Sequence, residues 1–216
     1  MKDGFIRVAA ATPDIHVADP QYNSEQIIEL MEQGSTRGVK VMAFPELCLT
    51  AYTCSDLFLQ ESLLREAKKE LKRILQASKS KDMILFVGMP WMHKGKLYNV
   101  AAVLNRGRIL GIVPKKHLPN YSEFYELRHF NPGMEKVEMT DWEGVQVPMG
   151  MNLLFACRTM PELVLAAELC EDVWVPCPPS ISHALAGATV IANCSASDET
   201  TGKDQYRYNL ICGQSA

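Results

Sequence analysis

The chain has 216 residues, 47% of them hydrophobic, and is long enough to bury one sizeable core or two small ones. Its formal net charge of -3 argues against a nucleic-acid partner, which usually requires a basic surface. There is no signal-peptide h-region and no apolar window of about 18–20 residues, so we expect a cytoplasmic protein that does not span a membrane.

Strand and helix patterns follow one another in an order that predicts a layered α/β protein with mixed sheets. Apolar runs predict strands at residues 5–11, 39–44, 83–89, 98–105, 108–113, 145–147, 153–157, 163–169 and 189–193. Helical spacing of apolar residues predicts helices at residues 23–38, 57–79, 182–186 and 204–214. We expect the charged face of the second helix, which includes Glu70, to be solvated.

No internal repeat and no linker divides residues 1–216, so a single domain is expected. The sequence stops inside a helical pattern without a cap, which suggests a truncated domain. The seven cysteines are odd in number, and we expect reduced thiols, at least five of them buried. No C-x-x-C pair occurs and the five histidines lack paired ligand spacing, so no metal site is predicted.

Glu46 directly follows the predicted buried strand at residues 39–44. A carboxylate at the mouth of such a strand is costly to desolvate without a partner, and this favours a general base. A solvent-facing loop glutamate explains the position equally well.

Lys115 likewise follows the predicted strand at residues 108–113. Lysines after strands are usually solvated, and Lys116 is an equal candidate, so these residues alone do not decide which lysine enters a site.

Cys170 ends the apolar strand at residues 163–169 and has a carboxylate on either side. A thiol with a pKa of about 8.5 needs a base or a cation to act as a nucleophile near neutral pH. Glu46 could take its proton, and Lys115 could stabilise a developing oxyanion. The backbone N–H of Glu171 is a natural second oxyanion donor.

Together these three residues resemble the Glu-Lys-Cys triad of the nitrilase, or carbon–nitrogen hydrolase, superfamily. The chain is similar over almost its whole length to the N-terminal glutaminase domains of glutamine-dependent NAD⁺ synthetases. The segments that carry this resemblance are residues 44–47, 50–52, 114–115, 118–121, 123–126, 170–174, 176, 178–180 and 184–188. The register of the family favours Lys115 over Lys116.

The resemblance implies an αββα sandwich with mixed sheets, C-terminally incomplete here, that pairs into homo-oligomers. It also implies hydrolysis of the glutamine side-chain amide through a cysteine thioester, without a cofactor. In that reaction Cys170 is the nucleophile, Glu46 the base, and Lys115 with the Glu171 N–H the oxyanion donors. Glu126 matches a second family glutamate that orients the lysine and the base.

Substrate contacts follow from the same resemblance. Aromatic side chains would enclose the aliphatic part of glutamine, and they are Tyr52, Tyr121, Phe124 and Trp174. Glu171 and Ser197 match positions near its α-amino group. Lys203 matches a position where some relatives have an arginine that binds the α-carboxylate. A lysine binds a carboxylate through a single ammonium and not through the two parallel N–H donors of an arginine. Plain core packing explains each pocket aromatic equally well.

In the family, a synthetase domain uses ATP and the released ammonia to convert deamido-NAD to NAD⁺. The sequence has no Ser-Gly-Gly loop and no G-x-x-x-x-G-K-[ST] motif, so it does not carry that chemistry itself. Two alternatives remain at this stage. One is a stand-alone amidase for another small amide or nitrile, and the other is a non-catalytic fragment that mediates assembly.

Overall fold

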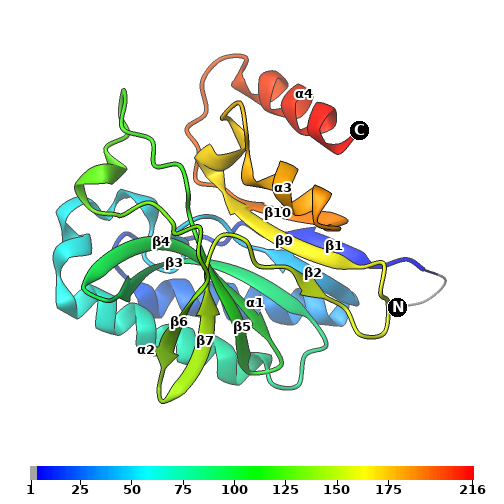
Figure 1. Cartoon of the computed structure of the whole chain (residues 1–216). Coiled ribbons are helices and arrows are strands. Elements are labelled where there is room, and N and C mark those ends of the chain that lie inside the picture. Colours follow the sequence, from blue (N-terminus) through cyan, green and yellow to red (C-terminus); the bar gives the residue numbers. More distant parts are fainter. Residues whose placement is uncertain (1–3) are drawn as a thin grey trace.

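A computed structural model describes residues 4–216 and arranges them in helix, sheet, sheet and helix layers (Figure 1). The seven-stranded sheet has the order β1-β2-β3-β4-β5-β7-β6, and the three-stranded sheet has the order β10-β9-β8. Both sheets contain parallel and antiparallel neighbours. The predicted αββα class with mixed sheets is therefore confirmed.

The large sheet brings two strand ends to the same edge. Its strands are β1 (Arg7–Ala10), β2 (Val39–Ala43), β3 (Ile84–His93), β4 (Lys96–Asn105), β5 (Arg108–Pro114), β6 (Glu138–Trp142) and β7 (Val145–Met149). β2 runs parallel to β3, and the β3–β4 and β4–β5 pairs are antiparallel. Consequently β2 and β5 point the same way, and the residues that follow them emerge at one edge.

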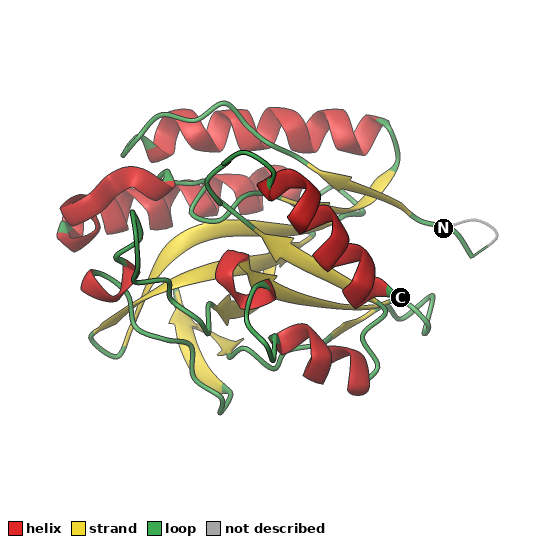
Figure 2. Ribbon diagram, turned by 90° about the horizontal axis from the view of Figure 1, so that it is seen from above, coloured by secondary structure: helices red, strands yellow, loops and turns green. Residues whose placement is uncertain are grey.

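Two long helices cover the outer face of the large sheet, and Figure 2 shows them along one side of the molecule. The helix α1 spans Pro20–Thr36, and Asp19 caps it by accepting the Tyr22 N–H at 3.1 Å. The helix α2 spans Glu61–Ser78 and buries one stripe against the sheet, formed by Leu63, Ala67, Leu71, Ile74 and Leu75.

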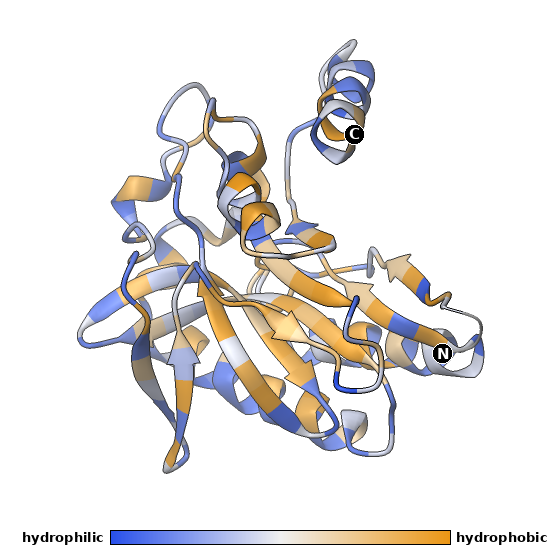
Figure 3. Ribbon diagram, turned by 45° about the vertical axis from the view of Figure 1, so that its right-hand side comes forward, coloured by the Kyte–Doolittle hydropathy of each residue, from blue (hydrophilic) through white to orange (hydrophobic). Residues whose placement is uncertain are grey.

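The small sheet packs on the inner face of the large one, and its strands are β8 (Phe155–Ala156), β9 (Val164–Leu169) and β10 (Val190–Cys194). Apolar side chains from both sheets form the core between them, including Phe86, Val103, Leu165 and Leu169. The helix α3 (Pro179–Leu185) packs on β9, whereas α4 (Lys203–Ser215) has no buried residue and lies outside the two sheets, beside α3 (Figure 3). Within residues 4–216 no helix is both long and apolar enough to cross a bilayer.

Three expectations from the sequence were wrong, and two features of the large sheet were not anticipated. The predicted helix at residues 57–79 is two elements, the 3-10 segment η1 (Tyr52–Leu59) and α2, because Gln60 between them is extended. β6 and the β3–β4 hairpin were not expected. Glu70 is buried between α1 and α2, where its Oε2 accepts the Ser24 hydroxyl at 2.5 Å. Finally, four of the seven free cysteines are buried rather than five or more.

Candidate active site

Glu46 lies in the turn after β2 and is 1% exposed. This turn packs directly on β3 at Gly88, where an added Cβ would stand 2.3 Å from the Pro45 carbonyl oxygen and 2.4 Å from the Leu47 nitrogen. Leu47 itself has a φ of 51°, in the left-handed region. The placement of Glu46 therefore depends on a glycine in the neighbouring strand.

Lys115 follows β5, and its side chain is fully buried, whereas Lys116 is half-buried. The Lys115 Nζ donates to Glu46 Oε1 and to Glu126 Oε1, each at 2.6 Å. Burial alone would lower the pKa of Lys115, but the two carboxylates outweigh it and the pKa is raised. The lysine is held as a cation between two acidic side chains.

Glu126 comes from the short segment η2 (Glu126–Arg128), which follows the irregular stretch after β5. Burial, together with the charge of Glu46, raises the pKa of Glu126. Its Oε1 also accepts the hydroxyl of Tyr52 at 2.7 Å. Tyr52 is thus a polar partner of the buried cluster as well as an aromatic neighbour of Phe124, with ring centroids 6.2 Å apart.

Cys170 begins η3 (Cys170–Val173) directly after β9 and is 5% exposed. Its φ of 40° places a non-glycine residue in the left-handed region, which is a strained position. Glu46, Lys115 and the Ala196 backbone N–H all influence the pKa of the thiol, so they are its polar neighbours. Burial and the negative charge of Glu46 raise the pKa of the thiol to about 12, so the resting cysteine is protonated at neutral pH.

Two buried polar residues that the sequence analysis did not single out complete the cluster. Asn99 on β4 donates from Nδ2 to Glu46 Oε1 at 2.6 Å. Asp172 accepts backbone N–H groups from both sides of the site, from Leu169 at 3.1 Å and from His117 at 2.7 Å. The only sequence signal for Asn99 was a polar residue inside an otherwise apolar strand.

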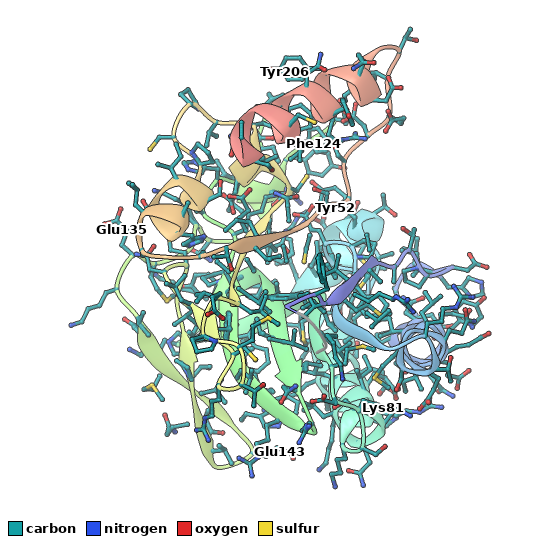
Figure 4. The ribbon with its side chains drawn as sticks, turned by 90° about the vertical axis from the view of Figure 1, so that its right-hand side faces the viewer. Tyr52, Lys81, Phe124, Glu135, Glu143 and Tyr206 are labelled. Atoms are coloured by element: carbon teal, nitrogen blue, oxygen red, sulfur yellow. The ribbon has the colours of Figure 1, made fainter. Side chains whose placement is uncertain are left out.

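Aromatic and charged side chains surround the mouth of the site. Tyr121 donates its hydroxyl to both Glu171 carboxylate oxygens, at 3.0 and 3.1 Å, and its ring lies edge-on to Phe124 at 5.8 Å. Figure 4 shows Phe124 and Tyr52 on the side of the molecule where α4 lies. Ser197 is half-buried in the loop after β10.

α4 approaches this mouth through its first turns. Tyr206 of α4 stacks on Trp174, with ring centroids 5.6 Å apart and planes 10° apart. The Lys203 Nζ lies 5.4 Å from the centre of the Trp174 ring and pairs with Asp198. Lys203 is therefore close to the mouth, but its ammonium is engaged by a carboxylate of the same loop.

A cavity of about 130 Å³ borders the cluster. Its lining includes Tyr52 and Glu126 of the cluster, together with Leu47, Thr53, Ser55, Phe58, Glu123, Phe124, Tyr125, His129 and Phe130. Cys170 is not part of this lining. The structure therefore brings Glu46, Lys115, Glu126 and Cys170 together beside a small cavity of mixed polar and apolar lining, with Tyr121, Phe124, Glu171 and Trp174 on the neighbouring segments.

Comparison with known proteins matches residues 7–210 to the family described as carbon-nitrogen hydrolase. The chain belongs to the carbon–nitrogen hydrolase family. It is 41% identical, over 213 residues, to the glutamine-dependent NAD(+) synthetase of Mycobacterium tuberculosis H37Rv, covering 99% of this chain and 31% of the relative. The chain thus spans about a third of the length of the curated relatives it matches.

Solved structures agree with this assignment. A glutamine-dependent NAD(+) synthetase from Cytophaga hutchinsonii superposes with a TM-score of 0.86 at 28% identity, over 97% of this chain and 33% of the other. An amidase from Nesterenkonia sp. superposes with a TM-score of 0.73 at 19% identity, over 97% of this chain and 71% of the other. The amidase shows likeness of fold alone.

Proposed function

We propose that the chain hydrolyses the side-chain amide of glutamine through a thioester on Cys170. The single observation that carries this proposal is the buried network in which Lys115 bridges Glu46 and Glu126 next to the buried Cys170 thiol, whose pKa both Glu46 and Lys115 influence. A buried carboxylate, ammonium and thiol that lie together form a base, an oxyanion donor and a nucleophile. The glutamine-dependent relatives support glutamine as the amide.

In the first step the Cys170 Sγ attacks the carboxamide carbon as its proton passes to Glu46. Because the thiol pKa is near 12, proton transfer accompanies the attack and no standing thiolate is needed. The Lys115 ammonium and the Glu171 N–H hold the resulting oxyanion. The C–N bond then breaks, Glu46 returns the proton to the nitrogen, and ammonia leaves a Cys170 thioester.

In the second step Glu46 takes a proton from a water molecule, and the hydroxide attacks the thioester carbon. The C–S bond breaks, glutamate is released, and the proton returns to the Cys170 sulfur. Glu126 and Tyr52 do not touch the reacting atoms in this scheme. They fix the position of the Lys115 ammonium, which serves both tetrahedral intermediates.

Glutamine binds with its aliphatic stem among the mouth aromatics, which are Tyr52, Tyr121, Phe124 and Trp174. Glu171 and Ser197 contact the α-amino group, and Lys203 contacts the α-carboxylate once it leaves Asp198. The net negative charge of the Tyr121–Glu171 corner favours an ammonium group. These contacts distinguish glutamine from a simple amide that lacks both charged groups.

We propose that the ammonia serves an ATP-dependent amidation of deamido-NAD to NAD⁺ by a synthetase domain; the relatives' names, which describe glutamine-dependent NAD(+) synthetases, support this use. Neither ATP nor deamido-NAD takes part in the glutaminase steps above. The proposed assembly is a homo-oligomer joined through the layers of the sandwich, which size-exclusion chromatography with light scattering would test.

A diazo-ketone analogue of glutamine, followed by peptide mass spectrometry, tests the proposal. We expect a covalent adduct on Cys170 that is lost in Glu46→Gln and Lys115→Ala and kept in Lys116→Ala, the matched control. Adducts confined to the exposed Cys177 and Cys212 would overturn it. Faster hydrolysis of simple amides than of glutamine would favour a stand-alone amidase, and no adduct at all would favour a non-catalytic fragment.

A further inference from the structure

Asn99 stands out among the buried residues because only one end of its side-chain amide is hydrogen-bonded: the nitrogen donates to carboxylates, and the oxygen has no partner among the described residues. It is 1% exposed, and its Nδ2 donates to Glu46 Oε1 at 2.6 Å and faces Glu126 Oε2 at 3.4 Å. Its Oδ1 is one of three buried side-chain polar atoms within residues 4–216 that have no hydrogen-bond partner. The donor end of the amide is therefore the end that binds protein groups, and both of those groups are carboxylates.

The orientation of the Asn99 amide follows from its neighbours. Turning it over would place Oδ1 at 2.6 Å from Glu46 Oε1, with two acceptors facing each other. The backbone around it is also fixed, because the Asn99 carbonyl accepts the Lys115 N–H at 2.9 Å. The amide and the ammonium that bind Glu46 are thus held side by side by adjoining segments of chain.

The two oxygens of Glu46 have different partners. Oε1 accepts from both Lys115 Nζ and Asn99 Nδ2, each at 2.6 Å. Oε2 accepts only the Ala196 N–H, at 3.2 Å. Ala196 and Glu46 both influence the pKa of the Cys170 thiol, and since the Ala196 N–H binds Oε2, we assign Oε2 as the oxygen on the side of the thiol. One oxygen is saturated by strong donors, and the other remains available for a proton.

We propose that Asn99 is a positioning residue that fixes Glu46 with Oε1 held and Oε2 turned to Cys170. This inference rests on the proposed function, because it assigns proton transfer to Glu46. A neutral amide suits the position: it adds a donor to the carboxylate without adding charge to a cluster that already holds two carboxylates and one ammonium. An aspartate of the same shape would add a third carboxylate and repel Glu46.

Several titratable groups face Glu46 from the surrounding elements. They are Lys115 after β5, Glu126 on η2, Tyr52 on η1, Cys170 after β9 and Cys194 on β10. Removal of the Asn99 donor leaves each of these in place. A shift in the pH dependence caused by Asn99→Ala therefore reports on the lost hydrogen bond.

The test measures the rate at which iodoacetamide alkylates Cys170 as a function of pH, in a background that carries Cys157→Ser, Cys177→Ser and Cys212→Ser, because these three thiols are exposed or partly exposed. Asn99→Ala removes a donor from the carboxylate proposed to accept the thiol proton, so the acidic side of the curve of alkylation rate against pH (the acid limb) should move to higher pH, by about one pH unit. Asn99→Asp should move it in the same direction and further. The matched control is Asn105→Ala, at the far end of the same strand, whose amide donates to the Met83 carbonyl; its limb should coincide with wild type.

With glutamine as substrate, Asn99→Ala should lower kcat by about 10- to 100-fold while KM changes little, because the base and not the binding site is displaced. An acid limb unchanged in both Asn99 variants would overturn the inference. Should Asn99→Ala fail to fold, the isosteric Asn99→Asp decides. If the wild-type protein shows the acid limb of Cys170 alkylation but does not hydrolyse glutamine, the proposed substrate is wrong. The comparison of the acid limbs of wild type and the Asn99 variants still tests the role of Asn99 in that case.

Discussion

Asp172 accepts the backbone N–H of His117 at 2.7 Å, across 55 positions of sequence. It also accepts the Leu169 N–H at 3.1 Å, so one buried carboxylate joins the end of β9 to the loop that carries Lys115. Cys170, the proposed nucleophile, and the Lys115 ammonium are therefore positioned by the same acidic side chain. Burial raises the pKa of Asp172 to about 7, although the backbone donors act in the opposite direction.

This raised pKa predicts a pH-dependent stability. The folded protein binds a proton on Asp172 that the unfolded chain has lost above about pH 4, so the stabilising contribution is full below that pH and disappears as the pH rises through about 7. Asp172→Asn should flatten the fall in free energy of unfolding between pH 5 and pH 8. Urea denaturation of wild type and Asp172→Asn at pH 5 and pH 8 gives the free energy of unfolding of each. An equal change in this free energy between the two pH values in both proteins would contradict the prediction.

Gly88→Ala should disrupt the turn that carries Glu46. Its new Cβ would lie 2.3 Å from the Pro45 carbonyl oxygen, and a rigid backbone cannot give way as a flexible side chain can. We expect a loss of about 1–3 kcal/mol in the free energy of unfolding and loss of most glutaminase activity. Gly213→Ala, on α4 with open space around it, is the control and should be neutral or slightly stabilising. Equal stability of the two variants would sink this account of Gly88.

Tyr52→Phe should separate the hydroxyl of Tyr52 from its ring. The ring still packs on Phe124, but Glu126 loses a donor at 2.7 Å and Lys115 is less firmly held. We expect kcat to fall by about 10-fold with little change in thermal stability. Tyr125→Phe, an exposed tyrosine beside the same cavity, should retain full activity. Steady-state kinetics decide, since equal kcat values for both variants would assign Tyr52 to packing alone.

Glu171→Gln should test the α-amino contact without removing the Glu171 backbone N–H. With the charge lost, KM for glutamine should rise by about 10-fold, whereas kcat should change little. Butyramide, which lacks the α-amino and α-carboxylate groups, provides the comparison. An equal loss of kcat/KM with both substrates would show that Glu171 acts in the chemistry or the fold and not in amine recognition.

The positions of Glu46, Lys115 and Cys170 could be anticipated because each follows an apolar strand, and buried strands are strong sequence signals. The choice between Lys115 and Lys116 could not be made from composition or spacing. It depends on two carboxylates, one of them on η2, that reach the lysine only in the folded chain.

Other parts of the site escaped prediction for a similar reason. Asn99 lies inside a strand whose apolar pattern hides a single polar residue, and its partners are 53 and 27 positions away. Asp172 binds backbone groups, which carry no residue-specific signal at all. Glu70 was predicted to be solvated because helical periodicity identifies only the face of α2 that packs on the sheet. It does not show that α1 covers part of the opposite, charged face, where Ser24 binds Glu70.

The left-handed backbone conformation of Cys170 sets the conformational stability of this protein against its proposed catalytic activity. A φ of 40° costs a residue with a Cβ about 1–2 kcal/mol, whereas glycine adopts it freely. Replacing the nucleophile by glycine should therefore relieve strain and abolish the reaction together. If Cys170 acts as proposed, selection for heat resistance alone would favour glycine at this turn, and selection for activity would favour cysteine.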